Sequence, residues 1–374
     1  MTAQQACPRC LARAWLLARL SGHLDQVRDR TDLLLELGDD ELIRAVAGRH
    51  AAEVSAQLAA FDADVARRRC AEAAVVPICR CDPGYPSRLR DLRAPPAVLH
   101  VGGDLARCRA LLGGEPVAIV GARRASPYGT DVAHWLARGL GAAGVTVISG
   151  MATGIDAAAH AGALSAAAGT VAVLPAGAER AYPAGARGLH RRIRATGAVV
   201  SELGPGVTVR RWMFPARNRL IAALSAMTVV IAAREGSGAL LTAGVAGELG
   251  RVVGAVPGQI TAPLSWGPHA LLRGGATLVA GPTDVLDALF GAGAEEDDAG
   301  VSQPAPLRPA PPPGPPALPC DLQRLLDAIA DGHETDDAFT IAELDPDRGL
   351  AALAALEIAG RIARRPGGRF AARP

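Results

Sequence analysis

Short runs of β-branched and small apolar residues alternate with Ala-, Gly- and Leu-rich segments of helical length across residues 105–290. This alternation is typical of a doubly wound, mainly parallel sheet with helices on both faces. We expect strands at residues 117–120, 145–148, 170–174, 198–201, 228–232 and 252–256. The expected helices include residues 129–143, 154–167, 216–225 and 238–249. The chain therefore predicts an α/β, Rossmann-like main domain.

Four segments rich in Gly, Arg and Ser lie where these strands end or where a helix begins. They read GARRAS from residue 121, SGMATGID from 149, FPARNR from 214 and REGSG from 234. The carboxyl ends of parallel strands meet at one edge of the sheet, where ligands of such folds bind. Backbone N–H groups at glycines and fixed guanidinium charges suit phosphate, so we expect a phosphate-rich ligand. The candidate binding residues are Gly121, Arg123, Arg124, Ser149, Gly150, Gly154, Arg217, Asn218, Arg219, Ser237 and Gly238.

The FPARNR segment is expected to open a helix, with Arg217 and Arg219 in its first turn. Cations at that end oppose the helix dipole, and an anion held between them and the helix end reverses the sign of the interaction. In the alternative, the arginines have a structural role and pair with Glu202 or Glu235. Both interpretations stay open at the level of the sequence.

Groups that serve common catalytic mechanisms are not found in the sequence. The chain has no lysine, which excludes a P-loop that hydrolyses nucleotides, and no Ser/His/Asp set, Cys/His set or HExxH motif is visible. Asp156 is interpreted as a capping residue in the first turn of its helix rather than as a general base. His160 and His269 are interpreted as structural. We therefore expect a protein that is not an enzyme and that uses no cofactor.

Charge and hydropathy narrow the class of protein further. The formal net charge is only +2, so any basic site must be a local patch. All 39 basic residues are arginines, so every basic contact is made by a planar, permanently charged group. No uncharged apolar run reaches the roughly 18 residues that a spanning helix needs, and arginines interrupt the first apolar stretch, unlike in a signal peptide. We expect a cytoplasmic protein with no membrane partner.

Further regions flank the main domain. Residues 1–75 predict a helical, SAM-like domain, and residues 76–104 a connector with one strand at 97–101. Residues 291–319 are acidic and then Pro/Ala-rich, which is typical of a semi-rigid linker. Residues 320–374 predict a winged-helix domain, with helices near 321–330, 341–344 and 349–360 and then a hairpin. Because arginine stands only at the ends of its last helix, we expect a protein contact or a weak DNA contact there.

Seven cysteines are an odd set for a disulfide scaffold, and in a large cytosolic chain we expect them to be reduced. Cys7 and Cys10 form a C-x2-C pair, and Cys79 and Cys81 a distant C-x-C pair. Together they supply four potential zinc ligands, although this spacing matches common zinc motifs only loosely. The alternative is a set of scattered, reduced thiols, some of them buried.

The order of the motifs resembles that of the DNA-processing protein A family (DprA, also called Smf). The family pattern has GSR or GTR after the first strand, SGxAxGID after the second, FPxRNRxI at a later helix, and then SGSLxTA and VPG. The matching segments here are residues 121–123, 149–156, 214–221, 237–243 and 256–258. The resemblance covers about residues 77–289. It implies a homodimer that binds single-stranded DNA without strong sequence preference and loads RecA recombinase onto it during natural transformation and recombination.

The chain departs from the family pattern at three positions. Gly236 stands where a basic residue usually precedes the SGS serine, and Ala232 where an acidic residue is common. The YPxxN turn survives as Tyr182 and Pro183, but Ala186 replaces its asparagine. One basic contact is therefore lost or is supplied from Arg234 instead.

Two other functions are weighed against this one. The same superfamily contains nucleotide-processing phosphoribohydrolases, but the glutamate that serves their chemistry is not found four or five residues after Gly238. A winged-helix regulator with a nucleotide-sensing core is the third possibility. For the dimer, the segment 270–289 offers an apolar surface, and the alternative is that these residues pack on the sheet. The apolar residues concerned are Leu271, Leu272, Val285, Leu286 and Leu289.

Overall fold

The computed structural model describes residues 6–166, 168–291, 319–330, 333–358, 361–364 and 370–372. The chain forms two compact units, Met1–Ala299 and Gly300–Pro374. The first unit contains the regions that the sequence divides near residues 75 and 104, and this division into separate domains stays a prediction. Nearly all of the predicted linker, residues 292–318, lies outside the described residues. No helix in the described ranges is both long and apolar enough to cross a membrane.

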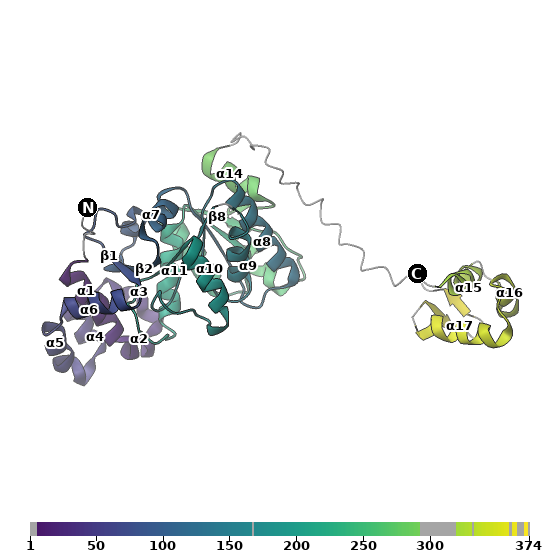
Figure 1. Cartoon of the computed structure of the whole chain (residues 1–374), viewed down its shortest axis with the longest axis horizontal. Helices are drawn as coiled ribbons and strands as arrows, with labels where there is room; N and C mark the ends of the chain where they lie inside the picture. Colours follow the sequence, from purple (N-terminus) through teal and green to yellow (C-terminus); the bar gives the residue numbers. More distant parts are fainter. Residues whose placement is uncertain are drawn as a thin grey trace. The chain divides into compact units, whose positions relative to one another are not determined.

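Nine of the described strands form one sheet in the first unit, in the order β1-β2-β6-β5-β4-β3-β7-β8-β9 (Figure 1). The pairs β1–β2 and β2–β6 are antiparallel, and every other pair is parallel. The predicted α/β class with a mainly parallel sheet is therefore confirmed. The strands are β1 (Val75–Cys79), β2 (Val98–Gly103), β3 (Val117–Gly121), β4 (Val147–Ser149), β5 (Thr170–Val173), β6 (Ala198–Ser201), β7 (Met227–Ala232), β8 (Val252–Ala255) and β9 (Thr277–Leu278).

The strand order reverses at β3. The chain runs outward from β3 through β4, β5 and β6, and then returns to place β7, β8 and β9 on the other side of β3. Helices that follow strands on the two sides of such a reversal leave a crevice beyond the carboxyl ends of the strands. The residues after β3, β4 and β7 are therefore the ones that meet there.

The predicted connector is wrong in one respect, because it contributes two strands to the sheet and not one. β1 includes Pro77, which has no N–H to donate to a ladder and which argues against a central strand. β1 lies at the edge of the sheet and pairs only with β2, so the proline is tolerated there. The short strand β9 at the opposite edge was likewise not predicted.

Alternate residues of the strands face two separate cores. In β3, Ala118 and Val120 face one side, which α7, α11, α12 and α13 cover, whereas Val117 and Ile119 face α8, α9 and α14. α10 covers β5 and β6 on the side away from α11. The helices are α7 (Leu105–Gly113), α8 (Pro127–Ala142), α9 (Ile155–Ala163), α10 (Arg187–Thr196), α11 (Met213–Leu224), α12 (Gly238–Glu248), α13 (Trp266–Arg273) and α14 (Pro282–Phe290).

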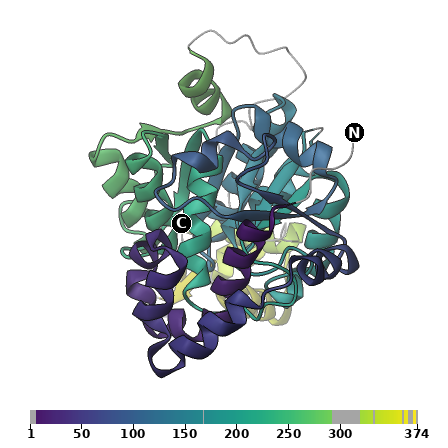
Figure 2. The ribbon, with the colours of Figure 1, turned by 90° about the vertical axis from the view of Figure 1, so that its left-hand side faces the viewer.

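The N-terminal helices gather beside the β1–β2 end of the sheet (Figures 1 and 2). Their leucines form a core together with Trp212, Met213 and Ala216 from the start of α11. The indole N–H of Trp212 donates to Ser21 Oγ at 3.0 Å, so the polar edge of this buried ring is satisfied. The helices are α1 (Pro8–Arg19), α2 (Ser21–Gln26), α3 (Thr31–Glu36), α4 (Asp39–Val46), α5 (Ala51–Ala59) and α6 (Ala63–Glu72).

The second unit contains three described helices and a two-stranded antiparallel sheet. They are α15 (Cys320–Ala330), α16 (Thr335–Ile341), α17 (Pro346–Ile358), β10 (Ile362–Arg364) and β11 (Phe370–Ala372). Leu325, Phe339, Leu353 and Leu356 meet in its core. The middle helix was predicted at residues 341–344. The structure places it at Thr335–Ile341 with Glu334 as its N-cap, so it ends at the residue where it was predicted to begin. The winged-helix assignment stays a prediction.

The apolar segment proposed for a dimer surface is largely occupied within the chain. Val285 is fully buried, and Leu286 and Leu289 pack against the same core as β3 and α8. Leu271 packs against the core on the other face of the sheet. These four residues therefore pack on the sheet, as the alternative interpretation predicted.

Candidate functional site

A cleft of about 350 Å³ opens beyond the carboxyl ends of the strands, between the end of β3, the loop before α9, and the helices α11 and α12. Six of the predicted binding residues line it. They are Gly121, Arg123, Arg217, Asn218, Ser237 and Gly238. Segments separated by as many as about 120 residues in the sequence thus meet at the edge of the sheet where parallel α/β folds bind their ligands.

Arg123 supplies the exposed positive charge of the cleft. Its guanidinium carbon lies 4.9 Å from the centre of the Phe214 ring, in cation–π contact. Phe214 in turn packs on Tyr182 at 5.5 Å between ring centres. The two aromatic rings, which the sequence analysis did not select, therefore restrain a side chain that is otherwise free to move. Arg124, the next residue, is exposed and does not line the cleft.

Arg217 forms the buried floor of the cleft. It is only 6% exposed, and its Nη1 donates to the carbonyl of Val173 at 2.9 Å. Burial lowers the pKa of the guanidinium, and the neighbouring Asp156 carboxylate opposes this shift. Its Nε has no hydrogen-bond partner among the described residues. Arg217 is thus a fixed charge with one donor left over beside the cleft.

Asp156 lies in the first turn of α9 as predicted, but it binds the loop before the helix and does not cap the helix N–H groups. Its Oδ2 accepts hydrogen bonds from the N–H groups of Gly150 at 3.2 Å and Ala152 at 3.3 Å. Burial raises the pKa of this carboxyl, although the charge of Arg217 and the two N–H groups oppose the rise. The N–H of Gly150 is therefore bound inside the protein, so it is not free for a ligand.

Within the SGMATGID segment, Ala152 and Asp156 line the cleft, whereas Ser149, Gly150 and Gly154 do not. Ser149 is fully buried, and its hydroxyl donates to the carbonyl of Ile119 at 2.7 Å. Gly154 is the N-cap of α9 and lies against the carbonyls of Ala122 and Arg123. The expectation that Gly150 presents its N–H to an anion is therefore corrected, because Asp156 accepts that N–H. Ser149 is buried within β4, and a contact between Gly154 and an anion stays a prediction.

The N-terminus of α12 does face the cleft. Ser237 is its N-cap, and the Ser237 hydroxyl oxygen is buried with no partner among the described residues. The N–H groups of Gly238 and Ala239 likewise find no acceptor in the described part of the chain. Asn218 Nδ2 donates to the Gly238 carbonyl at 3.1 Å and ties α11 to α12. Free donors at a helix N-terminus suit an anion.

Arg219 lies on the opposite side of α11 from the cleft. Residues i and i+2 of a helix do not face the same way, so Arg217 and Arg219 separate. Arg219 Nη2 donates to both carboxylate oxygens of Glu202 at 2.7 Å, and both side chains are buried. The structural alternative with Glu202 is therefore confirmed for Arg219. The prediction that both arginines lie in the first turn is wrong, because α11 begins at Met213.

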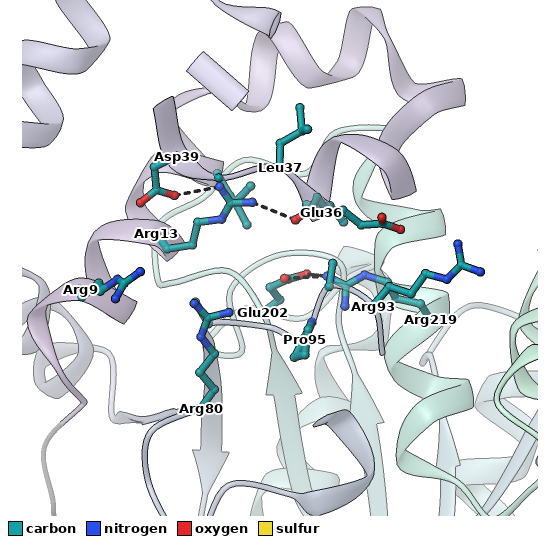
Figure 3. A pocket seen from close by; sticks show the side chains of 15 residues that line it. Arg9, Arg13, Glu36, Leu37, Asp39, Arg80, Arg93, Pro95, Glu202 and Arg219 are labelled. Carbon is teal, nitrogen blue, oxygen red and sulfur yellow. Dashed lines mark hydrogen bonds and ion pairs between the residues drawn. The ribbon is translucent and has the colours of Figure 1, made fainter. Parts of the chain in front are cut away.

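The Arg219–Glu202 pair closes the back of a second pocket, which the sequence analysis did not find (Figure 3). Arginines from α1, from the turn after β1 and from the loop before β2 line it. Arg13 is held by Asp39 at 2.9 Å and by the Leu35 carbonyl at 3.0 Å. Arg9, Arg80 and Arg93 are exposed and form no ion pair with a described residue. No local motif marks them, because they come from three separate segments.

Gly236, which stands where the family pattern has a basic residue, adopts a backbone conformation that favours glycine. Its φ is +67°, in the left-handed region that side chains rarely adopt. An arginine at this position would therefore strain the turn that leads into α12. Arg234 and Glu235 beside it are both exposed.

The two histidines are structural, as predicted. His160 is fully buried, and its Nδ1 pairs with Thr170 Oγ1 at 2.8 Å. Burial lowers the pKa of His160 to about 3, so the ring stays neutral. His269 Nε2 lies 3.0 Å from the carbonyl of Gly258, in the turn after β8.

The sequence model of the DNA recombination-mediator protein A family matches residues 77–290, more than half of the chain. A Mycobacterium tuberculosis protein named as a DNA processing protein DprA is 48% identical over 170 residues. That match covers 46% of this chain and 44% of the mycobacterial protein, so the chain spans less than half the length of that relative.

Two solved structures are similar to the chain. DNA processing protein A from Streptococcus pneumoniae is 30% identical, with a TM-score of 0.62 over 77% of this chain and 99% of that one. DNA processing protein A from Helicobacter pylori is 28% identical, with a TM-score of 0.50 over 57% of this chain and 95% of that one. The Helicobacter structure is described as showing a single-stranded DNA binding mode.

Proposed function

Because the chain belongs to the DNA recombination-mediator protein A family, we propose that it binds single-stranded DNA with little sequence preference and helps to load RecA recombinase onto it. The cleft that holds Arg123, Arg217 and the N-terminus of α12 carries this proposal. Its donors are a guanidinium restrained by Phe214 and unpaired N–H groups, which contact phosphates and do not read bases. The protein acts in DNA uptake and recombination, in the cytoplasm, as a homodimer and without a cofactor.

The rest of the chain is assigned to supporting roles. The helical N-terminal domain packs on the start of α11, and we assign it to holding the cleft helix in place. The C-terminal winged-helix domain is assigned to a protein contact or a weak DNA contact. The protein performs no catalysis in this proposal, because Asp156, the carboxylate that lines the cleft, is buried and bound to two N–H groups.

Replacing Arg123 with alanine is expected to weaken binding of single strands about tenfold, because a charged hydrogen bond contributes about 1.5 kcal/mol. Loss of one phosphate contact should also flatten the slope of log K against log salt by about 0.7. Fluorescence anisotropy with labelled oligonucleotides of several sequences, with duplexes and with free nucleotides measures both effects.

Arg138→Ala is the matched control for Arg123→Ala. Arg138 is also exposed, it lies on α8 eleven residues after the first residue of that helix, and it does not line the cleft. We expect this variant to keep the affinity of the unchanged protein. Tight binding of mononucleotides with no binding of oligonucleotides would instead favour a nucleotide-processing enzyme. If Arg123→Ala leaves the slope of log K against log salt unchanged, then Arg123 contacts no phosphate and the cleft is not the DNA-binding site.

The proposed homodimer places two clefts on one strand. Linked sites gain from effective concentration. A strand that is long enough to reach both clefts is therefore expected to bind at least about tenfold more tightly than a short strand that reaches a single cleft. In favourable geometry the gain is about 10² or more. Light scattering at micromolar concentration, together with affinity against oligonucleotide length, measures this. A monomer whose affinity does not change with length contradicts the dimer.

A further inference from the structure

Four cysteines that are distant in sequence meet at the edge of the sheet, away from the cleft. Cys7 is the N-cap of α1 and Cys10 lies in its first turn, so both sulfurs sit at the same end of the helix. Cys79 is the last residue of the edge strand β1, and Cys81 follows in the turn. Cys10 and Cys79 are each 3% exposed, whereas Cys81 is exposed. The cluster therefore joins the N-terminal helices to the sheet.

The sulfur atoms have the spacing of a tetrahedral metal site. All four Sγ atoms lie within 4.8 Å of one another. Cys7 and Cys81 are 4.0 Å apart, and Cys10 and Cys81 are 3.8 Å apart. Four sulfurs bound at ~2.3 Å around one tetrahedral Zn²⁺ lie ~3.8 Å from each other. The observed distances thus approach those of a zinc tetrahedron before any adjustment of the side chains.

Other arrangements of four cysteines fit less well. A disulfide needs its sulfurs at about 2.05 Å, and all four cysteines are free thiols. An iron–sulfur cluster would hold the sulfurs farther apart, because several iron atoms and sulfides lie between them. A single ion with four sulfur ligands remains, and tetrahedral sulfur coordination suits zinc.

We propose that Cys7, Cys10, Cys79 and Cys81 bind one Zn²⁺ ion in a structural site that fastens α1 to strand β1. The four thiols release their protons to solvent as the metal binds. Four protein ligands complete the coordination, as in structural sites, and leave no position for a substrate.

The surroundings of the cluster support a bound metal. The N–H of Cys7 lies 3.4 Å from Cys79 Sγ and donates to it, as backbone groups do around metal-bound sulfur. Zn²⁺ with four thiolates carries two net negative charges. Arg9 stands between the first two cysteines and Arg80 between the last two, and arginines at these positions offset that charge. The apolar side is closed by Leu11, Ala14 and Val98.

The site also has a consequence for the arginine-lined pocket in Figure 3. Arg9 and Arg80 lie on its rim, and each is flanked by two of the proposed ligands. Because the metal fixes both segments, it also fixes the backbone positions of these two charges. The zinc site rests on the cysteine geometry alone and does not depend on DNA binding.

The test uses the full chain, purified without chelators, and measures metal by mass spectrometry. We expect about one zinc per chain, and a loss of at least about tenfold in bound zinc in the Cys10→Ser/Cys81→Ser double variant. Replacing zinc with Co²⁺ should give the visible absorption bands of tetrahedral cobalt thiolate. Removing the metal should lower the melting temperature by about 5 °C or more.

Cys70→Ser is the matched control, because Cys70 is also 3% exposed, lies in the N-terminal helices and is not part of the cluster. It is expected to keep its zinc, which separates metal loss from general damage to folding. A full chain that carries no zinc and takes up no cobalt after reduction would overturn the proposal, even if the double variant fails to fold. Iron in place of zinc, or a double variant that keeps all its zinc, would also overturn it.

Discussion

Replacing Arg219 with methionine is expected to destabilise the folded chain by about 3–5 kcal/mol, because the carboxylate of Glu202 then lies buried without its partner. Arg219 Nη2 contacts both oxygens of that carboxylate at 2.7 Å. Urea denaturation, followed by the fluorescence of the buried Trp212 beside the start of α11, measures the loss. The slope of DNA affinity against salt should stay unchanged, because Arg219 lies on the far side of α11 from the cleft.

The control removes both charges together. A buried ion pair that is replaced by apolar side chains is often neutral for stability, because the desolvation cost of both groups disappears. Nε and Nη1 of Arg219 have no partner among the described residues, which adds to that cost. Arg219→Met with Glu202→Leu should therefore recover most of the lost stability. If Arg219→Met alone is as stable as the unchanged chain, or if it flattens the slope of DNA affinity against salt, then Arg219 contacts DNA and its structural role is contradicted.

Replacing Gly150 with alanine is expected to cost about 3 kcal/mol or more, through a different mechanism. A methyl group at Gly150 would overlap the guanidinium of Arg217. Gly150 itself is buried. Overpacking alone costs about 1–3 kcal/mol. Displacing Arg217 adds the cost of leaving Asp156 without its counter-ion. Chemical denaturation measures the stability, and the anisotropy assay should show weaker DNA binding because the floor of the cleft moves.

Gly188→Ala is the matched control for this substitution. Gly188 lies in α10, and a methyl group there meets nothing within 4 Å. Alanine is favoured over glycine in a helix by about 0.5–1 kcal/mol, so this variant should be slightly more stable than the unchanged chain. If Gly150→Ala behaves in the same way, Arg217 is not held against Gly150 in solution and the cleft has a different floor.

Local patterns predicted the strands of the main domain well. The runs around Val117, Val147, Thr170 and Val252 were placed to within about two residues, because buried parallel strands are short, continuous and apolar. β1 escaped prediction because its proline is acceptable only at an edge, and edge position is a property of the whole sheet. The beginning of α11 was placed three residues late for a similar reason. Trp212, which anchors that end, is held by Ser21 and Asp25 from a distant helix.

By itself, the sequence determined the order of strands and helices, the edge of the sheet where the cleft opens, and the family to which the motifs belong. These follow from hydrophobic periodicity and from the rule that parallel strands end together, and both are local or topological. Only the tertiary structure decided which of the predicted polar groups face the cleft and which ones have partners inside the protein. It turned Arg217 and Arg219 to opposite sides of one helix, gave the N–H of Gly150 to Asp156, and left the N-terminus of α12 free. It also brought Cys7 to Cys79 across 72 residues, because side-chain partners depend on how separate segments pack, and no local pattern records that packing.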